Sequence, residues 1–136
     1  MPFHAAYPVE NKEKTKAFYL DVLGLSQGRE DETWIDINFY GHQLVFHQVK
    51  NFKQKHYFNP VDSHQVPVPH FGVVLNLDDW HQLANRLEPY QLDFEIEPYI
   101  RFKGKPGEQA TMFFYDVNRY ALEFKAFKNQ QDLFKV

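Results

Sequence analysis

The strongest constraint on the fold is that the chain repeats one order of secondary-structure elements. Hydrophobic periodicity and turn residues predict a strand, a helix and three more strands in residues 1–49, and the same order again in residues 70–127. Because both units share one chain of 136 residues, we predict a single α+β domain spanning 1–136. Its expected architecture is a pair of tandem βαβββ modules.

The elements of the first module follow from alternating apolar residues and from helix signals. Asn11 is expected to cap a helix over Glu10–Leu23, which Gly24 terminates. Gly28–Glu32 is predicted to be a polar turn, and the glycine in Tyr40-Gly41 is typical of a hairpin turn. The expected strands cover residues 3–9, 25–27, 33–39 and 43–49.

The second module gives the same signals in the same order. Asp78 and Asp79 are expected to cap a helix that runs through Glu88 and must end at Pro89. The expected strands cover residues 70–77, 92–96, 111–115 and 121–127.

Three segments lack periodicity and are predicted to be irregular. Residues 50–69 form a long connection, in which Pro67 and Pro69 argue against a helix or a paired strand. Glu97–Ala110 is expected to be a loop rich in Gly, Pro and Lys, with a flexible basic part at Arg101–Gln109. The tail 128–136 is expected to dock through its Leu133-Phe134 pair.

The composition excludes several classes of function. The net charge of −3 and the pI near 6.1 give no basic footprint for nucleic acid. The absence of cysteine excludes a thiolate metal site and cysteine catalysis. No apolar run reaches the ~18 residues of a membrane span. We therefore expect a cytoplasmic protein with a small-molecule partner, and neither a nucleic-acid nor a membrane partner.

His4 and His70 open equivalent strands of the two modules, and Glu123 lies among apolar residues in the closing strand. A carboxylate in such a strand needs a partner, which could be a cation, a basic side chain or water. Two imidazoles and one carboxylate suit Fe(II), Mn(II), Ni(II) or Zn(II) and leave positions open for substrate. We predict that these residues bind one divalent ion; the alternative is a binding domain without metal.

The chain resembles the vicinal oxygen chelate superfamily, which includes glyoxalase I, extradiol dioxygenases and the bleomycin and fosfomycin resistance proteins. The resemblance rests on His4, on the helix Ala17-Phe-Tyr-Leu-Asp-Val-Leu-Gly-Leu25, on His70-Phe-Gly-Val-Val and on Tyr120-Ala-Leu-Glu-Phe124. It implies curved sheets that form a cup around a metal, with His4, His70 and Glu123 as ligands. Members of this size are often homodimers, so a homodimer is possible here.

Val45 decides which members the chain resembles most. Glyoxalase I has a glutamate ligand in the closing strand of its first module, and counting from Gly41 places Val45 there. Val45 cannot bind a metal, which leaves three ligands. A three-ligand site is similar to that of the extradiol dioxygenases and favours an oxidoreductase that uses Fe(II). The alternatives are a glyoxalase-like isomerase or lyase and a resistance-type protein that sequesters its ligand.

The remaining site residues are expected beside these ligands. His47 is a candidate proton carrier or substrate contact, and Gln43 on the same strand face is a candidate substrate contact. Dioxygenases usually have a tyrosine ten residues before the ligand glutamate. Phe113 stands there and is expected to contact substrate, whereas the nearby Tyr115 is the catalytic candidate. Arg101 could bind an anionic substrate.

Overall fold

A computed structural model describes all of residues 1–136. The chain divides into two compact units, which are described separately. Unit 1 contains residues 1–55 and 116–119, and unit 2 contains residues 56–115 and 120–136. No helix is long and apolar enough to cross a membrane.

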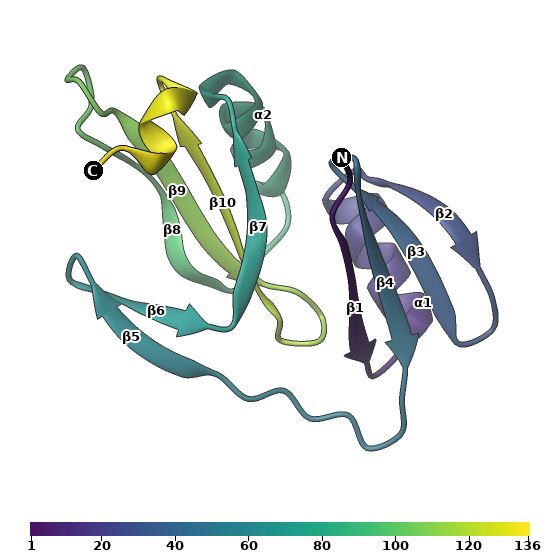
Figure 1. The fold of residues 1–136 in the computed structure, drawn as a ribbon. Helices are drawn as coiled ribbons and strands as arrows, with labels where there is room; N and C mark the ends of the chain where they lie inside the picture. The colour runs from purple at the N-terminus through teal and green to yellow at the C-terminus, as the bar shows by residue number, and fades with distance from the viewer. The chain divides into compact units, whose positions relative to one another are not determined.

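Unit 1 is a four-stranded sheet with one helical segment on one face (Figure 1). The strand order is β1-β4-β3-β2, with β1 parallel to β4 and the other neighbours antiparallel. The elements are β1 (His4–Val9), α1 (Lys12–Ala17), the π-helical segment η1 (Phe18–Val22), β2 (Ser26–Glu30), β3 (Trp34–Phe39) and β4 (His42–Gln48).

The helical segment of unit 1 begins after Asn11 and ends before Gly24, the two residues predicted to bound it. The Asn11 side chain caps it by accepting from the Lys14 backbone N–H, and Gly24 leaves it with a φ of 73°. Tyr19, Ile35 and Phe46 are fully buried between the helical segment and the sheet. The opposite face of this sheet carries His4, so the helix does not cover it.

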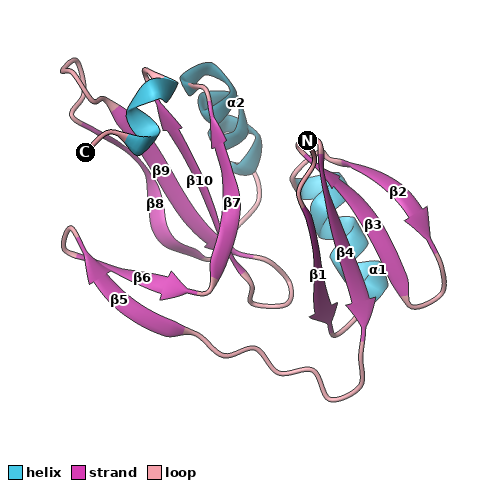
Figure 2. Ribbon diagram, in the orientation of Figure 1, coloured by secondary structure: helices cyan, strands magenta, loops and turns pink.

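Unit 2 repeats this topology. Its main sheet has the order β7-β10-β9-β8, and β7 is again parallel to its neighbour (Figure 2). The repeated βαβββ order is therefore confirmed. The elements are β5 (Tyr57–Val61), β6 (His64–Val68), β7 (His70–Leu75), α2 (Leu77–Leu87), β8 (Phe94–Arg101), β9 (Gln109–Tyr115), β10 (Ala121–Phe127) and the 3-10 helix η2 (Gln130–Phe134).

Helix α2 is capped by Asn76, whose side chain accepts from the Asp79 backbone N–H. The prediction that Asp78 and Asp79 cap this helix was wrong, because both aspartates lie in its first turn and Asn76 is the cap. Trp80 is buried and donates from Nε1 to the backbone oxygen of Phe124 over 2.9 Å, which fixes α2 against β10.

The prediction of an irregular connection over residues 50–69 was wrong for its second half. Strands β5 and β6 form an antiparallel hairpin there, and Pro67 is paired with Phe58 within it. Every residue of β5 is exposed, so its sequence has no alternation that would reveal a strand. Proline is tolerated because a two-stranded hairpin has only edge strands.

Two predicted loops are partly strand, and the tail is only partly docked. Residues 28–30 belong to β2, and residues 97–101 belong to β8. Both extensions lie in an outer strand of their sheet and carry no regular apolar alternation; the second also contains Pro98. In η2, Leu133 is half-buried, but Phe134 is 88% exposed.

Candidate functional site

The strand registers align the two modules residue by residue. In unit 1, His4 pairs with Gln43 across β1 and β4, and Val45 lies two residues further on. In unit 2, His70 pairs with Ala121 across β7 and β10, and Glu123 lies two residues further on. Val45 is therefore the counterpart of Glu123, as the sequence predicts, and the first module has no carboxylate at that position.

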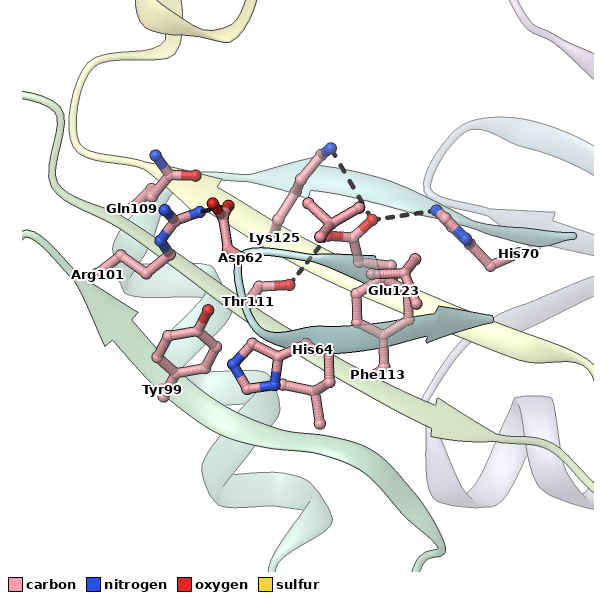
Figure 3. A pocket seen from close by; sticks show the side chains of 13 residues that line it. Asp62, His64, His70, Tyr99, Arg101, Gln109, Thr111, Phe113, Glu123 and Lys125 are labelled. Carbon is pink, nitrogen blue, oxygen red and sulfur yellow. Dashed lines mark hydrogen bonds and ion pairs between the residues drawn. The ribbon is translucent and has the colours of Figure 1, made fainter. Parts of the chain in front are cut away.

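His70 and Glu123 lie together on the face of the unit 2 sheet that α2 leaves open (Figure 3). His70 Nε2 is 3.3 Å from Glu123 Oε2, and the edge of the His70 ring packs on Phe113 at 5.0 Å between centroids. Two of the three predicted ligands thus meet within one unit.

Gly72 permits this close packing of β7 on β10. It pairs with Glu123, and a Cβ added at Gly72 would lie 1.5 Å from the Glu123 backbone oxygen. No side chain fits into that space, so glycine here is a requirement of the site and not of a turn.

Besides His70, Glu123 has one hydroxyl donor and one nearby ammonium group. Thr111 Oγ1 donates to its Oε1 over 3.0 Å, and Lys125 Nζ lies 3.9 Å from its Oε2. Burial raises the pKa of Glu123, but the His70 hydrogen bond, the Lys125 charge and the Thr111 hydroxyl outweigh it and lower the pKa overall. Glu123 is therefore an ionised carboxylate at neutral pH.

The ring of His70 is oriented by the chain just before it. Its Nδ1 lies 2.7 Å from the backbone oxygen of Pro67, and because a carbonyl only accepts, Nδ1 carries the hydrogen. The Glu123 hydrogen bond and the Pro67 carbonyl raise the pKa of His70 against the effect of burial. With the hydrogen on Nδ1, the neutral His70 ring has its lone pair on Nε2, which lies on the Glu123 side.

His4 is oriented in the same way by Gln43, which the sequence predicts to be a substrate contact. Its Nδ1 lies 2.7 Å from Gln43 Oε1, while Gln43 Nε2 donates to Asp36 Oδ2 over 3.1 Å. A carboxylate only accepts, so Asp36 fixes the amide orientation and the amide oxygen fixes the hydrogen on His4 Nδ1. The Nε2 atom of His4 is left with the lone pair.

Asp36 is the residue of this face that sequence reasoning missed. It is only 7% exposed, and Arg29 Nε lies 3.6 Å from its Oδ2. Its alternation between Ile35 and Ile37 is ordinary for a strand with one wet face. The one sequence signal was the glycine at position 28. In the structure β2 passes close over Asp36 there, and a Cβ on Gly28 would lie 3.3 Å from Asp36 Cβ.

The donor set suits a divalent metal. Both histidines engage Nδ1 with an oxygen acceptor and leave Nε2 for coordination, which is the usual arrangement of metal-binding imidazoles. No three His, Asp or Glu side chains are gathered as a complete metal-binding group. Within unit 2 the site is the pair His70 and Glu123.

A cavity of about 320 Å³ adjoins this pair in unit 2 (Figure 3). The hairpin of β5 and β6 contributes one wall and the open face of the main sheet contributes another. At the cavity, Arg101 Nη1 and Asp62 Oδ2 form a 2.7 Å ion pair, and the ring of His64 lies 5.5 Å from that of Tyr99. Its lining is Val61, Asp62, His64, Val66, His70, Ile96, Tyr99, Arg101, Gln109, Thr111, Phe113, Glu123 and Lys125.

The other predicted site residues are distributed as follows. Phe113 and Arg101 line this cavity. Tyr115 is buried, and its hydroxyl donates to Glu95 over 3.2 Å. His47 pairs with Pro8 and lies four residues along β4 from Gln43, the residue opposite His4. The separation of His47 from Gln43 is roughly 13 Å at the rise of a β-strand.

Comparison with known proteins agrees with this fold. Residues 2–124 match the family model "Glyoxalase/Bleomycin resistance protein/Dioxygenase superfamily". None of the curated proteins matches the sequence.

Solved structures with the same fold are similar over nearly the whole chain. A glyoxalase/bleomycin resistance protein/dioxygenase from Alicyclobacillus acidocaldarius is 24% identical with a TM-score of 0.77, covering 98% of this chain and 96% of its own. The fosfomycin resistance protein FosX from Listeria monocytogenes is 15% identical with a TM-score of 0.66, covering 90% and 89%.

The family match covers most of the residues, and both modules have the expected topology. This chain belongs to the glyoxalase/bleomycin resistance protein/dioxygenase superfamily.

Proposed function

We propose that the protein is a divalent-metal-dependent enzyme that uses His4, His70 and Glu123 as ligands and acts on a small substrate with vicinal oxygens. One observation carries this proposal: both histidines have Nδ1 hydrogen-bonded to an oxygen, so both present Nε2, and the His70 atom lies 3.3 Å from Glu123. The two histidines share this arrangement at equivalent positions of the two modules, which supports a common role.

The ion would supply Lewis acidity to the substrate oxygens. The chain would supply the positioning. Thr111 holds one Glu123 oxygen, the Pro67 carbonyl and Phe113 set the His70 ring, and Gln43 sets the His4 ring. The cavity beside His70 would enclose the rest of the substrate.

Within this class we favour an Fe(II) enzyme of the extradiol dioxygenase type. Val45 in place of a fourth ligand supports it, because three protein ligands leave room for both substrate and oxygen. A glyoxalase-like isomerase or lyase is the second candidate. A resistance-type protein for a small drug is the third, supported by the likeness to FosX.

Elemental analysis of protein purified with metals available tests the proposal. We expect one divalent ion per site, lost in His4→Ala, His70→Ala and Glu123→Ala and kept in His81→Ala, which alters an exposed histidine. Protein without metal that also gains no thermal stability from Fe(II), Mn(II), Ni(II) or Zn(II) would overturn the proposal. Oxygen uptake with catechols, compared with hemithioacetal turnover, separates the first two candidates.

A further inference from the structure

The cavity of unit 2 has a second charged end, where the hairpin meets the main sheet. Asp62 and Ser63 form the two-residue turn between β5 and β6, with φ of 49° and 68°. The turn brings the Asp62 carboxylate to Arg101 at the end of β8, with 2.7 Å between Nη1 and Oδ2. The guanidinium is mostly covered, with 29% of the side chain exposed, whereas 54% of Asp62 is exposed.

The strand registers place this end at a defined distance from the predicted metal ligands. On the cavity face, the row after Glu123 and Phe113 contains Lys125, Thr111 and Tyr99, and the next row contains Gln109 and Arg101. One step of two residues is roughly 7 Å and two steps are roughly 13 Å at the rise of a strand. Arg101 also lies two strands from Glu123, which adds roughly 10 Å across the sheet. Both residues line the same cavity, so they stand at its two ends.

The charges of the cavity are balanced by the chain itself. Arg101 is opposed by Asp62, and Lys125 lies 3.9 Å from Glu123. Coordination of a divalent ion by Glu123 would leave the cavity with excess positive charge. The Asp62 end of the ion pair with Arg101 is open to solvent, and ion pairs at the surface contribute little to stability, so a ligand can replace Asp62 at small cost.

We propose that this cavity binds a small organic oxyanion, whose carboxylate or phosphate-type group takes the place of Asp62 on Arg101. The guanidinium fork suits the paired oxygens of both groups, and Gln109, Tyr99 and Lys125 offer further donors around it. This inference rests on the proposed function for the opposite end of the ligand. It makes the substrate an anion whose charged group binds at the end of the cavity opposite its metal-binding oxygens.

Asp62 is then an internal competitor, and its removal should strengthen binding. The probes are inorganic phosphate and acetate, titrated separately into metal-free protein and followed by the NMR signals of the Arg101 side chain and of the β9 amides. In Asp62→Asn we expect the dissociation constant of at least one probe to fall by about three- to ten-fold. In Arg101→Gln we expect it to rise by about ten-fold or more.

A matched control separates this effect from a general change in net charge. Asp132→Asn removes a carboxylate paired with Lys135 at 3.5 Å, outside this cavity, and should leave both dissociation constants unchanged. Equal effects of the two variants, or weaker binding in Asp62→Asn, would overturn the inference. Retained β8 and β9 amide signals check that Arg101→Gln is folded, and the tighter-bound probe identifies the kind of oxyanion.

The outcome is independent of the metal proposal because the titrations use metal-free protein. Metal binding without an Asp62 effect refutes the oxyanion site alone. An Asp62 effect in a protein that binds no metal refutes the proposed function alone.

Discussion

His4 and Gln43 lie opposite each other on paired strands, and a 2.7 Å hydrogen bond joins His4 Nδ1 to Gln43 Oε1. Since Asp36 accepts from the other end of the same amide, the tautomer of His4 is set two side chains away from the ring. The arrangement predicts the effects of changes that leave the proposed metal ligands in place.

Gln43→Leu removes the acceptor for His4 Nδ1. We expect His4 to shift towards the tautomer with its hydrogen on Nε2, visible in its imidazole nitrogen NMR signals, and metal affinity to fall by roughly 10- to 100-fold. Asp36→Asn should have a smaller effect of the same sign, because an asparagine allows either amide orientation. Glu32→Gln, an exposed change in the same unit, is the control. An unaltered His4 spectrum in Gln43→Leu would refute this role.

Thr111→Val removes the hydroxyl that donates to Glu123 over 3.0 Å while keeping the side-chain volume. A hydrogen bond to a charged group contributes about 1.5–3 kcal/mol. We expect the pKa of Glu123 to rise and metal affinity to fall by roughly ten-fold, measured by calorimetry. Thr33→Val, at an exposed position, should change neither. Wild-type affinity in Thr111→Val would mean that Thr111 does not hold the carboxylate.

The raised pKa of His70 predicts how the stability of the metal-free protein depends on pH. Because the Glu123 hydrogen bond raises this pKa above its ordinary value of 6.5, the folded state binds the proton more tightly than the unfolded state. The resulting stability is fully present below pH 6.5 and is lost as pH rises through the folded pKa. Urea unfolding of wild type and His70→Gln over this range should converge at high pH. A constant difference between them would contradict this linkage.

Glu30 predicts the opposite dependence in unit 1. Hydrogen bonds from Lys16, Gln27 and Lys12 lower its pKa from 4.5 to about 2. Its contribution to stability is therefore present above pH 4.5 and is lost as pH falls towards 2. Glu30→Gln should lose part of the wild-type stability at pH 6 and much less of it near pH 2, by thermal unfolding. Glu32→Gln serves as the control at both pH values.

The fold was predictable because its apolar pattern repeats, and the site was predictable only in part. Counting from Gly41 identified Val45 as the counterpart of Glu123, since strand register follows the turn. The hairpin of β5 and β6 escaped prediction because its side chains are mostly exposed and carry no alternation. Asp36 escaped because its burial depends on Gln43 and Gly28, which lie on other strands.

The position of the β5–β6 hairpin in the chain means that the cavity wall can change without changes to the predicted metal ligands. The hairpin is encoded in the connection between the modules, whereas His4, His70 and Glu123 lie on strands of the repeated units. Replacement of residues 57–66 would alter the cavity wall and the Asp62 contact while keeping every predicted ligand and the Pro67 carbonyl that orients His70. A library confined to this short segment would therefore vary the ligand preference of the cavity and leave the proposed metal ligands untouched.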